Sequence, residues 1–110
     1  MQFERALDTS ELPEGKMAMV VVGGTEVLLV NVGGNYHAIA NKCNHLGGSL
    51  AKGKLEGSIV TCPRHGAQFD VKTGQSVREA KIAFLKTRVQ DQELYTVKVE
   101  GTTIMIGKPG

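Results

Sequence analysis

Short apolar stretches that end at glycine or polar turns recur along the chain, and this pattern constrains the fold most strongly. Residues 17–22 and 25–31 flank Gly23-Gly24, which predicts a tight hairpin. Residues 94–100 alternate between apolar and polar side chains. Similar short stretches are residues 36–40, 54–56, 58–61, 68–71 and 102–106. Because the apolar period is two and not 3.6, we predict an all-β, antiparallel domain.

The glycine content and the scarcity of helical patterns support the same prediction. The sequence has 14 glycines in 110 residues, and glycine destabilises helices while permitting tight turns. Residues 8–12 predict one helical turn, which Pro13 and Gly15 end, and residues 76–81 show no clear preference. We expect residues 1–110 to form a single domain, in which the glycine-rich segment of about 41–74 is a small inserted subdomain.

The balance of charge and hydropathy argues against several classes of function. Lys and Arg total 13 against 11 Asp and Glu, a formal net charge of +2, with no basic run for nucleic acid or a membrane surface. The longest apolar run is residues 17–22, far shorter than the roughly 20 residues that cross a bilayer. The charged N-terminus has no apolar core of a signal peptide. We therefore expect a cytoplasmic protein with reduced thiols.

Two short segments each combine a cysteine with a histidine. Cys43-Asn44-His45 and Cys62-Pro63-Arg64-His65 are separated by sixteen residues that contain two strand-like stretches, so a hairpin could bring the segments together. Two sulfur and two nitrogen ligands at one place are suited to a soft metal. Three interpretations remain open: buried cysteines with surface histidines, a structural Cys2His2 zinc site, and an iron–sulfur cluster with mixed ligands.

The two segments resemble the signature of the Rieske 2Fe–2S family. The similarity includes His45-Leu46-Gly47 and Cys62-Pro63-x-His65-Gly66, and it continues through Phe69-Asp70 and Thr73-Gly74. The resemblance implies an antiparallel β framework with a small cluster-binding subdomain formed by the two Cys/His loops. It also implies one 2Fe–2S cluster per chain. The buried iron would be held by Cys43 and Cys62, and the outer iron by His45 and His65.

Four departures distinguish this chain from the Rieske proteins of cytochrome bc-type complexes. Members of that subgroup carry an extra cysteine in each loop, at positions that look like Gly48 and Arg64 here. They also carry a Ser and a Tyr whose hydroxyls donate to the cluster sulfurs, where this chain has Ala67 and Phe69. Without these donors the added electron is less stabilised, so we expect a reduction potential at the low end of the Rieske range.

The remaining histidine helps to separate the other members of the family. Rieske oxygenases add a mononuclear iron site of two histidines and a carboxylate, and His37 alone cannot supply it. We expect His37 to be an exposed or edge-strand residue. The resemblance therefore implies a stand-alone ferredoxin, an electron carrier and not an enzyme. It would take electrons from an NAD(P)H-dependent flavoprotein reductase and pass them to the terminal oxygenase of an aromatic-ring-hydroxylating system or a similar acceptor.

Two alternatives remain beside this interpretation. One is the Rieske-like small subunit of an assimilatory nitrite reductase, and the other is a zinc-stabilised interaction module without a redox role. Residues 76–93, which would cover the cluster, lack the prolines found in many relatives, so the cover is expected to be looser or built differently. The cations in or beside the loops are either a docking rim for an acidic partner or an ordinary solvated surface; they are Lys42, Lys52, Lys54 and Arg64.

Overall fold

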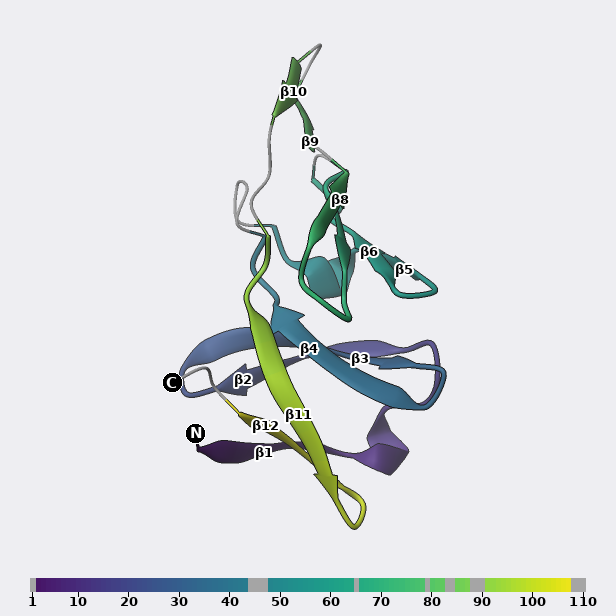
Figure 1. Ribbon diagram of the computed structural model, residues 1–110, viewed down its shortest axis with the longest axis vertical. Helices are drawn as coiled ribbons and strands as arrows, with labels where there is room; N and C mark the ends of the chain where they lie inside the picture. Colours follow the sequence, from purple (N-terminus) through teal and green to yellow (C-terminus); the bar gives the residue numbers. More distant parts are fainter. Residues whose placement is uncertain are drawn as a thin grey trace.

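Antiparallel sheets make up nearly all of the regular structure. The computed structural model describes residues 2–43, 48–64, 66–78, 80–82, 85–87 and 91–107. A six-stranded sheet of order β1-β12-β11-β4-β3-β2 forms the base of the molecule, and a four-stranded sheet of order β5-β6-β7-β8 lies beyond it (Figure 1). The strands are β1 Phe3–Asp8, β2 Met17–Val22, β3 Thr25–Val32, β4 Asn35–Ala40, β5 Lys54–Glu56, β6 Ile59–Thr61, β7 Gln68–Asp70, β8 Ser76–Arg78, β9 Ala80–Ile82, β10 Leu85–Thr87, β11 Leu94–Glu100 and β12 Thr103–Gly107.

The sequence prediction of an all-β, antiparallel fold is confirmed. The predicted hairpin is β2 paired with β3, and it closes at Val22 and Thr25. The predicted helical turn is the 3-10 helix η1 Thr9–Glu11, whose N-cap Asp8 accepts a hydrogen bond from the Ser10 backbone N–H. A second 3-10 turn, η2 Leu50–Lys52, was not predicted. Among the described residues, no helix is long and apolar enough to cross a membrane.

The first strand, β1, was not predicted from the apolar pattern of the sequence. Strand β1 pairs with β12, but its register shifts between Arg5 and Leu7. A bulge of this kind places two residues opposite one and therefore breaks the alternation that predicts a strand. Charged residues also occupy much of β1, because its solvent-facing side chains need no apolar partner.

Residues 76–93, left unassigned by the sequence, contribute three short strands. Strand β8 extends the small sheet by pairing with β7, so this sheet continues past residue 74. Strands β9 and β10 pair only with each other, as a two-stranded ribbon that projects beyond the small sheet (Figure 1). The expected difference in the cover over the cluster stays a prediction. Residues 79, 83–84 and 88–90 lie outside the described residues.

Strand β3 is shared between two hydrophobic cores. Leu28 and Val30 belong to the core that contains Cys43 and Cys62, whereas Val27 and Leu29 belong to the core between the strands of the base. Alternate residues of a strand point to opposite faces, so a strand between two cores is apolar at every position. This strand therefore connects the base directly to the cysteines.

Candidate metal centre

The first cysteine loop follows β4 and returns within a few residues. The Cys43 backbone N–H donates to the Gly48 carbonyl at 2.7 Å, and Lys42 forms an isolated antiparallel bridge with Ser49. These contacts hold the two ends of the loop together. Residues 44–47, which include the predicted ligand His45, lie outside the described residues.

A buried amide fixes the base of this loop. The Asn41 side chain is fully buried, and its Nδ2 donates to Glu26 Oε1 at 3.0 Å and to Ser49 Oγ at 2.9 Å. Its Oδ1 accepts the Ala51 backbone N–H at 2.9 Å. Because a buried amide that loses its partners is costly, these bonds specify one conformation for the chain on both sides of the loop.

A second buried amide ties a distant segment to the same loop. Gln92 Nε2 donates to the carbonyls of Ala40 at 2.9 Å and Lys42 at 2.8 Å. The Gln92 backbone N–H donates to the Gly74 carbonyl at 2.7 Å. A side chain at position 74 would run into the Gln92 carbonyl oxygen, and Gly74 also has a φ of +79°. Residue 74 is therefore a glycine for both reasons.

The second cysteine loop connects β6 to β7. The Cys62 N–H donates to the Ala67 carbonyl at 2.7 Å, and the Gly66 N–H donates to the Cys62 carbonyl at 3.3 Å. The turn needs a left-handed residue, which Gly66 supplies with a φ of +76°. Beyond the turn, Thr61 pairs with Gln68. The hairpin predicted within the sixteen residues between the two loops is β5 paired with β6, which leads directly into the second loop. The other predicted ligand, His65, lies outside the described residues.

The two loops meet at Gly48. A Cβ on this residue would lie 3.0 Å from Cys62 Sγ and 3.1 Å from Arg64 Cγ, so the first loop packs directly on the second. Sequence comparison with the bc-type proteins identified position 48 only as a missing cysteine. The structure adds a steric reason for glycine, since a larger residue would press on the thiol of the other loop.

The two cysteines share one buried environment. Their exposed fractions are 2% for Cys43 and 3% for Cys62, and the core around them includes Ala67 and Phe69. Both cysteines are among the described residues, and they form no disulfide. Phe69 is fully buried, which confirms that it is a core residue.

This donor set fits a metal centre that needs thiolates. Two buried sulfurs on abutting loops can become thiolate ligands of one soft metal ion, because metal binding lowers the pKa of a thiol. In the described part of the chain, no three His, Cys, Asp or Glu side chains form a further cluster. Of the four predicted ligands, the structure therefore brings Cys43 and Cys62 together, and the placement of His45 and His65 stays a prediction.

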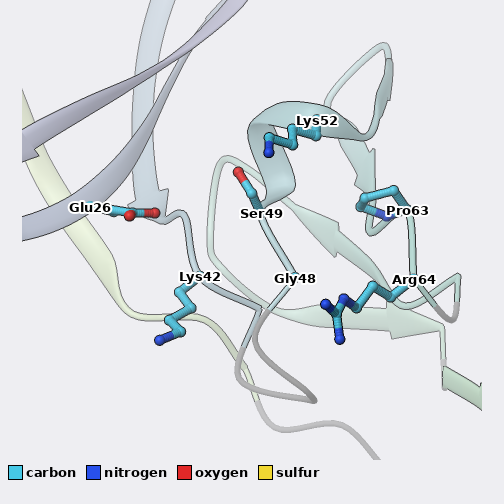
Figure 2. A pocket seen from close by; sticks show the side chains of 7 residues that line it. All are labelled: Glu26, Lys42, Gly48, Ser49, Lys52, Pro63 and Arg64. Atoms are coloured by element: carbon cyan, nitrogen blue, oxygen red, sulfur yellow. The ribbon is translucent and has the colours of Figure 1, made fainter.

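A concavity with several cations lies beside the cysteine loops. Its volume is about 370 Å³, and Figure 2 shows Gly48 on its wall together with Lys42, Arg64 and Lys52. The complete lining is Glu26, Lys42, Gly48, Ser49, Lys52, Pro63 and Arg64. Three of the four cations that the sequence placed near the loops are therefore gathered here, whereas Lys54 is on β5 and is not among the lining residues. The sequence did not indicate Glu26 or Ser49.

His37 lies on β4, away from the cysteine loops. It pairs with Val30 of β3 and lines a separate groove with Lys72. Burial lowers the pKa of His37, the Lys72 ammonium lowers it further, and the Asp70 carboxylate opposes both effects. The side chain is half-buried rather than exposed. Strand β4 lies between β11 and β3 in the base, so the expectation that His37 is exposed or on an edge strand is wrong.

Comparisons with known proteins all point to the same family. The Rieske [2Fe-2S] domain matches residues 2–87. The ferredoxin component of a naphthalene 1,2-dioxygenase system from Pseudomonas aeruginosa is 38% identical over 96 residues, which cover 87% of this chain and 86% of the relative. The corresponding component from Pseudomonas putida is 35% identical over 106 residues, covering 96% of this chain and 95% of the relative.

Solved structures agree with this result. The ferredoxin of carbazole 1,9a-dioxygenase from Nocardioides aromaticivorans IC177 superimposes with a TM-score of 0.86 at 30% identity, covering 99% of this chain and all of the other. A ferredoxin from Sphingomonas yanoikuyae B1 superimposes with a TM-score of 0.79 at 25% identity, covering 98% of this chain. With its two buried cysteines on abutting loops, this chain belongs to the Rieske [2Fe-2S] domain family.

Proposed function

We propose that this chain is a one-electron carrier, the ferredoxin component of an aromatic-ring-hydroxylating dioxygenase system. It accepts electrons from an NAD(P)H-dependent flavoprotein reductase and delivers them to a terminal oxygenase, and it catalyses no substrate reaction itself. The proposal is supported by relatives of this description that match most of the chain. It is also supported by a solved complex of oxygenase and ferredoxin in carbazole 1,9a-dioxygenase, in which a chain of this fold accompanies the oxygenase.

The observation that carries the proposal is the placement of the two cysteines. Cys43 and Cys62 come from loops that touch at Gly48, and both thiols are buried without forming a disulfide. We assign them to one iron of a 2Fe–2S cluster, with His45 and His65 on the other iron. When bound, such a cluster takes up and releases one electron at a potential set by its ligands and their hydrogen bonds.

The protein around the cysteines performs the remaining tasks. Burial of Cys43 and Cys62 among Leu50, Val60 and Phe69 excludes water from the sulfur ligands. Asn41 and Gln92 hold the first loop, and a loop that does not rearrange keeps the reorganisation cost of electron transfer low. We further propose that residues 1–110 are one Rieske domain with a cluster-binding subdomain of about 41–74, and that the protein works in the cytoplasm, where NAD(P)H is available.

The decisive experiment is a metal count on the purified protein together with its spectra. We expect about two iron and no zinc per chain, a red-brown colour, and a reduced-state EPR signal typical of mixed Cys/His ligation. About one zinc per chain in a colourless protein, from cells grown with ample iron, would replace electron transfer by a structural zinc site.

Ligand assignment is tested by single substitutions. We expect Cys43→Ser, His45→Ala, Cys62→Ser and His65→Ala each to abolish the Rieske spectrum. His37→Ala is the matched control, because His37 lines a groove that the cysteine loops do not share, and it should retain full iron content. Loss of the spectrum in the control, or its retention in either histidine variant, would contradict the assignment.

A further inference from the structure

Charge is distributed unevenly between the two parts of the molecule. Residues 41–93 carry nine Lys and Arg against five Asp and Glu, whereas the rest of the chain carries four against six. The molecule is elongated, with extents of 48 × 28 × 18 Å, and strands β5 to β10 lie beyond the six-stranded base (Figure 1). The small net charge of +2 therefore divides into a positive excess within residues 41–93 and a negative excess in the rest of the sequence. A field of this form orients a charged partner before contact.

Part of this positive charge is gathered around the concavity described above. Lys42, Lys52 and Arg64 line it, and Figure 2 shows Gly48 between Lys42 and Arg64 in that view. Neither lysine forms an ion pair with another described residue. The lining includes one acid, Glu26, and its Oε1 already accepts a hydrogen bond from Asn41. The concavity therefore presents an excess of positive charge.

The concavity also lies against the cysteine centre. Gly48 is part of its lining, and the position of a Cβ on this residue is 3.0 Å from Cys62 Sγ. A partner group that enters the concavity would thus come within a few atoms of a cluster ligand. Short distances of this kind are what an electron carrier needs at its docking face, and transient redox complexes rely on small, charged interfaces.

We propose that the concavity of Lys42, Lys52 and Arg64 is the docking site for an acidic, carboxylate-bearing surface of the redox partner. This inference rests on the proposed function, because it assigns the partner's chemistry at the same site. Of the cations near the loops, Lys52 is part of this docking site and Lys54 is not. The two lysines are only two residues apart, so Lys52→Glu and Lys54→Glu change the net charge equally. Only Lys52 lines the concavity, so a difference between the two variants reports on the concavity and not on the overall charge of the molecule.

Direct binding tests the surface without any turnover. A fluorescein-labelled octaglutamate peptide is titrated into the holoprotein at about 20 mM and about 300 mM salt, with fluorescence anisotropy as the readout. We expect binding only at low salt, weakened roughly fivefold or more by Lys52→Glu and less than twofold by Lys54→Glu. Equal weakening by both variants, or equal binding of octalysine, overturns the proposal. Binding of inorganic phosphate, measured by calorimetry, without binding of the peptide identifies a free-anion site and also overturns it.

Small charged oxidants test the same surface by kinetics. The reduced protein gives one electron to ferricyanide, which becomes ferrocyanide, or to hexaamminecobalt(III), which becomes the cobalt(II) complex. We expect the ferricyanide rate to fall with salt and the cobalt rate to rise, and Lys52→Glu to reduce both trends more than Lys54→Glu. Opposite trends contradict the positive docking face. Iron content and EPR of the same samples test the proposed electron-carrier function independently of the docking site. Either proposal can therefore fail while the other stands.

Discussion

Gln92 shows how one residue far away in sequence can hold a cysteine loop. Its side chain donates to the carbonyls of Ala40 and Lys42, which are 52 and 50 residues away. Only 4% of Gln92 is exposed, so water does not replace these bonds readily. Gln92, which lies just before β11, therefore holds the loop that carries Cys43 in a fixed place relative to that strand.

Replacing Gln92 should loosen that loop. Gln92→Leu removes the hydrogen bonds to two part-buried carbonyls and should lower the free energy of unfolding by roughly 2–4 kcal/mol. We also expect faster loss of cluster absorbance in the presence of EDTA. Asn31→Leu is the control, because Asn31 is another buried amide, whose Nδ2 donates to the Leu12 carbonyl at 2.9 Å, and neither residue belongs to a cysteine loop. It should cost roughly 1–3 kcal/mol and leave the rate of cluster loss almost unchanged. Equal rates in the two variants would mean that Gln92 acts on general stability alone.

Ala67 and Phe69 should set the reduction potential. Neither side chain carries a hydroxyl, so we expect a midpoint toward the lower end of the roughly −150 to +300 mV Rieske range. Ala67→Ser supplies a donor beside Cys62 and should raise the midpoint by about 30–60 mV, because about 1 kcal/mol corresponds to roughly 40 mV for one electron. Ala38→Ser makes the same change in the other core and should not shift it. Voltammetry that returns a wild-type midpoint above about +200 mV would refute the argument.

At the scale of the elements, close packing between neighbours restricts the turns of the small sheet. Gly53 ends η2, and a Cβ on it would run into the Thr61 carbonyl oxygen of β6. Gly57, in the β5–β6 turn, has a φ of +60° but open space around it. One glycine is thus required by a neighbouring strand and the other by its own backbone.

Alanine substitutions should separate these two requirements. Gly53→Ala should lower the free energy of unfolding by about 3 kcal/mol, because β6 has to move away from η2. Gly57→Ala should cost only about 1 kcal/mol, the strain of a left-handed residue with a side chain. Urea unfolding of both variants measures the difference. If Gly57→Ala proves the more damaging, the close approach of η2 and β6 is not the constraint described here.

How far the sequence predicts this molecule depends on whether the cause of each feature is local. The β2–β3 hairpin follows from apolar stretches around Gly23-Gly24, and the cysteine loops follow from a compact motif. Strand β1 was missed because its bulge interrupts the alternation. Asn41 and Gln92 were missed because their partners are distant in sequence, so no local pattern marks them.

At the scale of the whole molecule, strand β3 contributes side chains to both hydrophobic cores. Leu28 and Leu29 are adjacent and fully buried, yet Leu28 packs with the cysteines and Leu29 packs inside the base. A substitution at either position removes the same number of atoms from a core. The two positions therefore offer a test of whether the cluster responds to global stability or to its own core.

Leu28→Ala and Leu29→Ala should each lower the free energy of unfolding by about 2–5 kcal/mol, the cost of a cavity in a core. We expect them to differ in the metal centre. Leu28→Ala opens space in the core that holds Cys43 and Cys62, so iron should be lost to a chelator several times faster than from Leu29→Ala at matched stability. Calorimetry gives the stability, and the decay of visible absorbance gives the rate of iron loss. Equal rates would show that the base and the cysteine core open as one cooperative unit, in which β3 transmits any loss of packing to both faces.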